Sequence, residues 1–132
     1  MSTPITPIRL LLLDGVTTGT SLAFPCQDYT APALYITGTG TITAGTLIVE
    51  EAYWPPDLGS TYAGTWSTIY TIVPPATTAA ASIDLTALTG GSPGKQMSIK
   101  LTGPNAYANV RVRVGATVTG GGTVSVELVA TV

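Results

Sequence analysis

Charged residues are scarce in this chain. Aspartate, glutamate, lysine and arginine make up 9% of its 132 residues, whereas about a quarter of the residues of an ordinary soluble domain are charged. Threonine, serine and glycine fill the polar positions instead, and hydroxyl groups are cheaper to desolvate against a neighbour than charges are. Because a freely diffusing domain resists self-association with a well-charged surface, this scarcity predicts that the chain works inside an assembly.

Histidine is absent, and Cys26 is the single cysteine. These shortages exclude an intrachain disulfide, Ser-His-Asp or Cys-His catalysis, and the usual ligand sets for zinc, haem and iron–sulfur clusters. Cys26 also has no lysine or arginine beside it in the sequence that would activate its thiol. We therefore expect no cofactor and no metal, and a Cys26 side chain that packs as a small apolar group.

Four aspartates lie near expected turns, where a carboxylate commonly accepts hydrogen bonds from nearby backbone amides. A calcium site built from these loop carboxylates is an alternative that the sequence leaves open. The four residues are Asp14, Asp28, Asp57 and Asp84.

The net charge is −2, and the five basic residues are spread along the chain. No basic field for phosphate groups results, so we expect no nucleic-acid partner. The apolar stretch Ile8–Leu13 is interrupted by Arg9 and stopped by Asp14 and Gly15, which makes it too short for a signal-peptide core or a transmembrane helix. It is predicted to be a buried strand of a protein made in the cytoplasm, with no membrane partner.

Apolar and polar residues alternate most clearly over residues 108–118. Alternation with a period of two is typical of a strand with one buried face. After a glycine-rich segment at 119–123 the alternation resumes over residues 124–132, and the two stretches predict a hairpin. The inward side chains are expected to be Val110, Val112, Val114, Ala116, Val118, Val124, Val126, Leu128, Ala130 and Val132.

Eight further short strands are expected, separated by glycine and proline turns, and no window carries a helical stripe. Eight to ten short strands predict an all-β, single-domain antiparallel sandwich of jelly-roll type. Prolines at positions 4 and 7 predict an extended N-terminal arm over residues 1–8, which leaves residues 9–132 for the sandwich. The eight strands are expected at residues 10–13, 21–24, 33–37, 41–44, 46–52, 66–73, 82–85 and 97–101.

Two long irregular stretches, residues 53–64 and 73–81, are predicted to be functional or mobile loops. Tyr53, Trp54, Tyr62 and Trp66 cluster around the first of them. These aromatic side chains fit a cap on the core, an anchor for a protein interface, or a stacking platform for sugars.

Signs of catalysis are weak. Glu50 and Glu51 are adjacent carboxylates, but neighbours on a strand point to opposite faces, so one of them is expected to be solvated or salt-bridged. The glycine-rich run at residues 38–45 lacks the lysine or the helix start that phosphate loops require and is expected to be a turn. The chain is therefore not expected to be an enzyme.

In length, strand order and low charge, the chain resembles the small jelly-roll decoration, or cement, proteins of tailed-bacteriophage capsids. The stretches that carry the resemblance are residues 40–50, 64–68 and 108–114 and the closing glycine-rich segment. The resemblance implies a structural virion protein, in homotrimers or similar clusters, that binds the outer surface of the major capsid protein lattice and stabilises the capsid. The interface candidates are Pro4, Ile5, Pro7, Arg9, Tyr53, Trp54, Pro55, Tyr62, Trp66 and Pro74.

Two other functions fit a compact β-fold with exposed aromatic residues. One is a carbohydrate- or receptor-binding module of a phage tail appendage, and the other is a tail-tube or connector protein. Binding to glycans would favour the first, and assembly of the purified protein into rings or tubes would favour the second.

Overall fold

A computed structural model of the chain describes residues 8–25, 30–53, 65–73, 76–89, 95–101 and 109–131. These residues form short strands and a single turn of 3-10 helix, and no helix among them is long and apolar enough to cross a membrane. In chain order the elements are β1 (Ile8–Val16), β2 (Phe24–Pro25), β3 (Thr30–Thr39), β4 (Thr46–Ala52), β5 (Ser67–Ile69), β6 (Ile83–Asp84), η3 (Thr86–Leu88), β7 (Lys95–Lys100), β8 (Asn109–Val114) and β9 (Thr123–Thr131).

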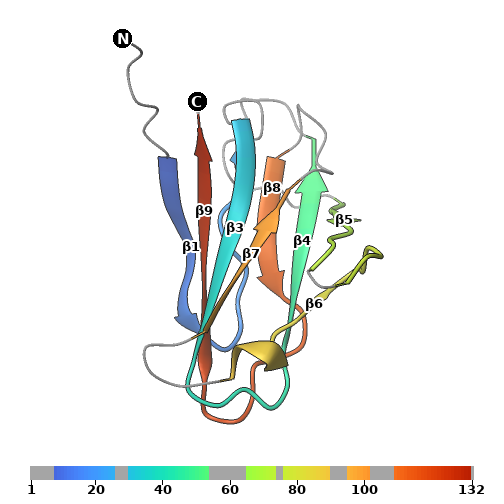
Figure 1. Ribbon diagram of the computed structural model, residues 1–132. Helices are drawn as coiled ribbons and strands as arrows, with labels where there is room; N and C mark the ends of the chain where they lie inside the picture. The colour runs from blue at the N-terminus through green and yellow to red at the C-terminus, as the bar shows by residue number, and fades with distance from the viewer. Residues whose placement is uncertain are drawn as a thin grey trace.

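The strands form two antiparallel sheets that face each other (Figure 1). Sheet A has the order β1-β9-β3-β7, and sheet B has the order β2-β8-β4-β5, with β6 also paired to β4. Strand β4 holds β5 through Val49, Glu50 and Glu51 and holds β6 through Thr46 and Leu47, so β5 and β6 share one edge of sheet B.

The pairing is nested from the ends of the chain inward. β1 pairs with β9, β2 with β8, β3 with β7, and β4 with β5 and β6. Two antiparallel sheets of four strand positions connected in this way are a jelly roll. The predicted all-β sandwich of jelly-roll type is therefore confirmed.

The predicted alternation builds the core between the sheets. Val110 and Val112 of β8 are fully buried, as are Val124, Val126 and Leu128 of β9. Their outward neighbours are only partly covered, because each sheet has one face in the core and one toward solvent. Sheet A and sheet B thus each have an outer face that points away from the core.

The predicted hairpin at residues 108–132 is wrong, because β8 lies in sheet B and β9 lies in sheet A. Strand β8 ends at Val114, and the chain then crosses between the sheets. Gly115 N–H donates to the Thr46 carbonyl at 2.9 Å, and Ala116 N–H donates to the Thr46 hydroxyl at 2.8 Å. These bonds turn the backbone out of the ladder and leave Ala116 exposed, although Val118 returns to the core.

Strand β1 differs from the buried strand that was expected. It lies at the edge of sheet A, where Leu13 is buried but the Leu11 side chain is 59% exposed on the outer face. The strand begins at Ile8, which pairs with Ala130, so the last residue assigned to the arm already belongs to the sheet.

Two other expected strands are shorter or missing. Residues 41–44 form a turn with a single bridge from Ala44 to Thr119, because Gly40 and Gly45 on either side adopt positive φ angles of 70° and 151°. Residues 66–73 were expected to be one strand, but only Ser67–Ile69 pairs with β4. Beyond it, Thr71 bridges to Ala80 instead.

Candidate functional site

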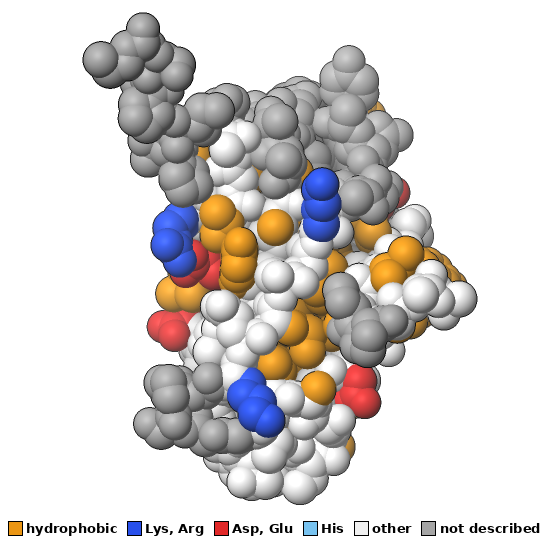
Figure 2. All heavy atoms as spheres, viewed as in Figure 1, with side chains coloured by type: hydrophobic (Ala, Val, Ile, Leu, Met, Phe, Trp, Pro, Cys, Tyr) orange, Lys and Arg blue, Asp and Glu red, His pale blue; other side chains and the backbone are white. Residues whose placement is uncertain are grey.

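The outer face of sheet A is poor in charge. Its charged side chains, at the described positions that strand pairing places on this face, are Arg9, Lys100 and Glu127; Asp14 of β1 is exposed as well, and hydroxyl or small apolar groups fill most other positions (Figure 2). We call this surface the sheet A face. It consists of Arg9 and Leu11 of β1, Ala33, Tyr35, Thr37 and Thr39 of β3, Gln96, Ser98 and Lys100 of β7, and Thr123, Ser125, Glu127 and Val129 of β9.

Many polar groups of the sheet A face already have partners within the chain. Arg9 pairs with Glu127 across β1 and β9. The Thr39 and Thr123 hydroxyls lie 2.7 Å apart across β3 and β9. The Ser125 hydroxyl accepts a 2.8 Å hydrogen bond from the Gly15 amide. A partner protein could cover these groups without leaving them unsatisfied, which removes the main cost of burying polar surface.

Leu11 is the large exposed apolar side chain of the sheet A face. It lines a shallow hollow of about 80 Å³ together with Arg9, Tyr35, Thr37 and Glu127. Covering an exposed apolar side chain with a partner removes apolar surface from water and favours association. The sheet A face therefore combines low desolvation cost with an anchor point.

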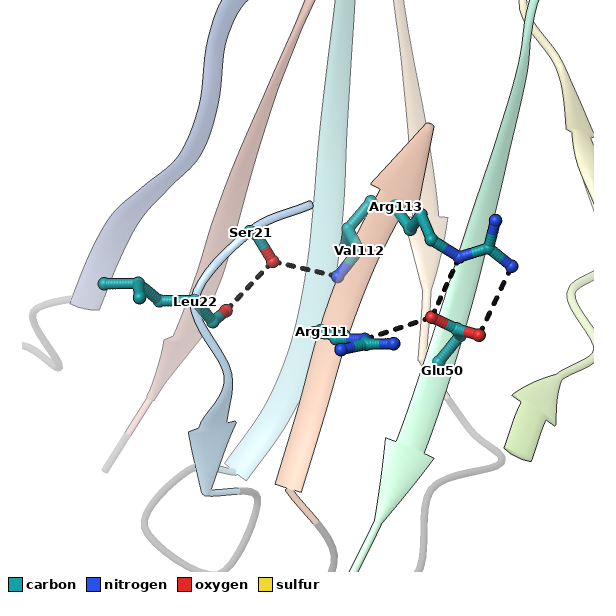
Figure 3. Close-up of polar contacts among 6 residues, drawn as sticks. All are labelled: Ser21, Leu22, Glu50, Arg111, Val112 and Arg113. Carbon is teal, nitrogen blue, oxygen red and sulfur yellow. Dashed lines mark hydrogen bonds and ion pairs between the residues drawn. The ribbon is translucent and has the colours of Figure 1, made fainter. Parts of the chain in front are cut away.

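The outer face of sheet B carries a different cluster, centred on Glu50 (Figure 3). The Glu50 side chain is 8% exposed, and its Oε1 accepts hydrogen bonds from Nε of Arg111 and Nε of Arg113, each at 3.1 Å. Arg113 also donates from Nη2 to Oε2 at 3.4 Å. One of the two adjacent carboxylates is thus salt-bridged, as predicted.

Trp66, which directly precedes β5, packs against Arg111 of the Glu50 cluster. The Arg111 guanidinium lies 4.1 Å from the centre of the Trp66 ring, close enough for a cation–π contact. Trp66, one of the interface candidates chosen from the sequence, is half-buried. Its ring contact helps to position the Arg111 side chain. Arginine, tryptophan and carboxylate together stiffen the outer face of sheet B.

Burial on its own would raise the pKa of Glu50, but the hydrogen bonds and charges of Arg113 and Arg111 outweigh it and hold the pKa below its ordinary value of 4.5. Asp84 also has a lowered pKa, because its Oδ1 accepts hydrogen bonds from the Thr86 amide at 2.9 Å and the Thr86 hydroxyl at 2.8 Å. Asp84, the last residue of β6, thus accepts a hydrogen bond from a nearby backbone amide, as expected.

These pKa values predict how stability depends on pH. A carboxyl group with a lowered folded-state pKa stabilises the fold above its unfolded-state pKa, and that stability is lost as the pH falls through the folded-state value. The free energy of unfolding is therefore expected to fall as the pH drops below about 4.5. Urea titrations between neutral and acidic pH test this, and Glu50→Gln should fall less steeply than the unmodified chain. Equal slopes would contradict the assignment.

The structure places three of the interface candidates on separate surfaces. Arg9 lies on the sheet A face and Trp66 on the outer face of sheet B, whereas Tyr53 follows the end of β4 and is 70% exposed. The other candidates lie outside the described residues, as do Cys26, Asp28 and Asp57. They are Pro4, Ile5, Pro7, Trp54, Pro55, Tyr62 and Pro74.

Several surface residues were missed by sequence reasoning. Leu11, Tyr70 and Ile72 were assigned to strands without regard to side, yet they are 59%, 63% and 50% exposed. Alternation shows which residues share a face but not whether another element covers that face. For Leu11 the sequence did hold a signal: Leu11 lies two residues after Arg9, so the two side chains share one face of the strand, and a charged arginine marks that face as exposed.

Glu50 is neutralised by two guanidinium groups and is thereby fixed as a hydrogen-bond acceptor. Within the described ranges, no three acidic, cysteine or histidine side chains gather in a way that could hold a metal ion.

Comparison with known proteins gives one fold likeness. The chain is similar to the crystal structure of the SPBc2 prophage-derived protein YomS, with a TM-score of 0.60 and 12% sequence identity. The match covers 100% of this chain and 98% of the other. No protein-family model and no curated protein matches the sequence. At this identity the likeness shows a common fold over the whole chain.

Proposed function

We propose that this chain is a structural protein of a bacteriophage particle, which decorates the capsid and stabilises it by binding the outer surface of the major capsid protein lattice. The sheet A face carries the proposal, because its polar groups are largely paired within the chain and its charge is low. The whole-length likeness to a prophage-derived protein supports the phage origin.

The proposed mechanism is adhesive. Each copy lays the sheet A face on the shell, with Leu11 as an anchor, and copies associate with one another as a homotrimer. A standard protein interface buries about 800 Å² on each partner. Many copies that bind only the assembled shell stabilise it by mass action, so each contact can be modest. No catalytic role is proposed.

Binding to capsids tests the proposal. Purified chain is mixed with expanded capsids that lack it, taken from the phage whose genome encodes it, and occupancy is measured by co-sedimentation. We expect Leu11→Asp to lower the apparent affinity at least about tenfold, because a carboxylate would be buried against the shell. Leu22→Asp is the matched control, because Leu22 is 71% exposed and neighbours Ser21, which bonds to β8 of sheet B. It should bind like the unmodified chain.

Cryo-electron microscopy of the loaded particle then locates the chain. Density that bridges subunits on the outer surface of the shell is the expected result. Density confined to the tail would replace the proposal with the tail-appendage or tail-tube function. Glycan binding that is lost in Trp66→Ala would favour the carbohydrate-binding module.

A further inference from the structure

Strand β7 has a free edge. In the described part of the chain it pairs only with β3, at the end of sheet A. The Leu101 amide donates to the Pro32 carbonyl of the β3 strand at 3.0 Å. Because backbone groups alternate in direction along an antiparallel strand, the N–H and C=O groups of Gln96, Ser98 and Lys100 point away from β3. These three residues present a ladder that another strand could pair with.

An apolar groove runs along this free edge. Two hollows, of about 780 and 660 Å³, share Thr71 in their lining and together follow β7 from end to end. In Figure 2, hydrophobic side chains gather beside β7 between two blue ones. Tyr70 and Ile72 stand in the wall opposite β7. The other apolar lining includes Val73, Leu88 and Met97 in the first hollow and Ile69, Ile99 and Leu101 in the second.

Positive charge marks both ends of the groove. Lys95 lines the first hollow and Lys100 lines the second, five residues apart, or roughly 17 Å along a strand. Asp84 also lines the first hollow, where its carboxylate accepts two hydrogen bonds from Thr86 and places a negative charge in the same hollow as Lys95. The groove is therefore apolar at its centre and has a lysine at each end, and the positive charge is less offset at the Lys100 end.

These lysines disfavour pairing of β7 with β7 of a second copy. Antiparallel pairing of two β7 edges would place two lysines from each copy along the shared edge, and like charges brought near each other destabilise a strand pair. Lysine on an edge strand is a common device against self-association. The same two charges favour a partner strand that carries carboxylates.

We propose that the groove beside β7 binds an extended segment of another protein, apolar at its centre and with a carboxylate near each end, which joins sheet A as an added strand. Backbone pairing to Gln96, Ser98 and Lys100 would supply affinity, and Lys95 and Lys100 would set the register. The groove shares Ser98 and Lys100 with the sheet A face but does not include Leu11, so peptide binding to the groove is measured independently of capsid binding through Leu11. If the chain does decorate a capsid, the segment would come from a shell subunit.

Peptide binding to the full chain tests this inference. The probes are synthetic peptides of about six residues, with alternating valine and threonine between two end residues that are both aspartate or both lysine, so that the end charges are five residues apart like Lys95 and Lys100. We expect the aspartate-ended peptide to bind at least about tenfold more tightly than the lysine-ended one. Hydrogen exchange should slow at the Gln96, Ser98 and Lys100 amides. The double variant Lys95→Glu with Lys100→Glu should reverse the preference.

A second pair of variants separates strand addition from simple charge attraction. The Ser98 amide points away from β3, so Ser98→Pro removes a donor from the free edge without breaking a bond in the sheet. Ser98→Pro should keep the thermal stability of the sandwich and abolish binding, whereas Ser98→Ala should bind normally. Undetectable binding of the aspartate-ended peptide, equal affinity for both peptides, or full binding by Ser98→Pro would overturn the inference.

Discussion

Replacing Gly122 with alanine is expected to lower the free energy of unfolding by about 3 kcal/mol. A Cβ atom at this position would overlap the Thr39 carbonyl oxygen and come within 2.7 Å of the Thr41 carbonyl oxygen. Both obstacles are backbone atoms, so no side chain can rotate away to make room. The Gly122 amide also donates to the Thr41 carbonyl at 2.8 Å, which ties the loop before β9 to the loop before β4.

Urea unfolding measures this cost, and Gly15→Ala provides the comparison. Gly15 has a positive φ of 59°, but nothing lies within 4 Å of the added Cβ atom. Its substitution should therefore cost only the strain of the left-handed conformation, about 1 kcal/mol. A Gly122→Ala variant no less stable than Gly15→Ala would show that the two loops can move apart.

Replacing Glu50 with alanine is expected to destabilise the fold by about 2 kcal/mol. The change leaves Arg111 and Arg113 side by side on β8 without the carboxylate that they share. Removing one member of a fully buried pair costs about 3–5 kcal/mol. The two arginine side chains are 24% and 37% exposed, so water solvates the released charges in part and reduces the loss.

The control for Glu50→Ala is Glu127→Ala, which removes the partner of Arg9 on the sheet A face. The Arg9 side chain is 68% exposed, so this ion pair should contribute less than about 0.5 kcal/mol. Chemical denaturation of both variants at neutral pH compares them directly. Equal losses would mean that the Glu50 cluster contributes no more than an ordinary surface ion pair.

The sequence predicted which residues face the core but not which strands are neighbours. Alternation over residues 110–114 and 124–130 assigned the buried valines correctly. Successive side chains of a strand point to opposite faces, so every second residue shares a face whatever the neighbouring strands are. The glycine-rich segment between these two stretches favoured a local hairpin. The structure instead sends the chain from sheet B to sheet A there, since each strand pairs with a partner far away in the sequence.

Because strand neighbours could not be predicted, the candidate sites could not be predicted either. Glu50 and the two arginines each lie on the polar side of an alternating strand, but their meeting depends on β4 and β8 being neighbours. The groove beside β7 likewise exists because β7 is an edge strand, and strand order is not visible in a local pattern. Trp66 was found from its residue type alone, because aromatic side chains near loops are often contacts whatever the topology.

Strand β9 lies between β1 and β3, in the middle of sheet A. Until it is in place, β1 has no partner in the sheet, since its pairing runs from Ile8–Ala130 to Val16–Val124. During synthesis, therefore, sheet A cannot close until the ribosome has released the residues of β9, which lie near the end of this sequence. Until then the inward leucines of β1 are not packed beside β9, and this exposed apolar surface can aggregate or bind a chaperone. A chain stalled before β9 would be a substrate for proteolysis, whereas a chain that includes β9 can close sheet A.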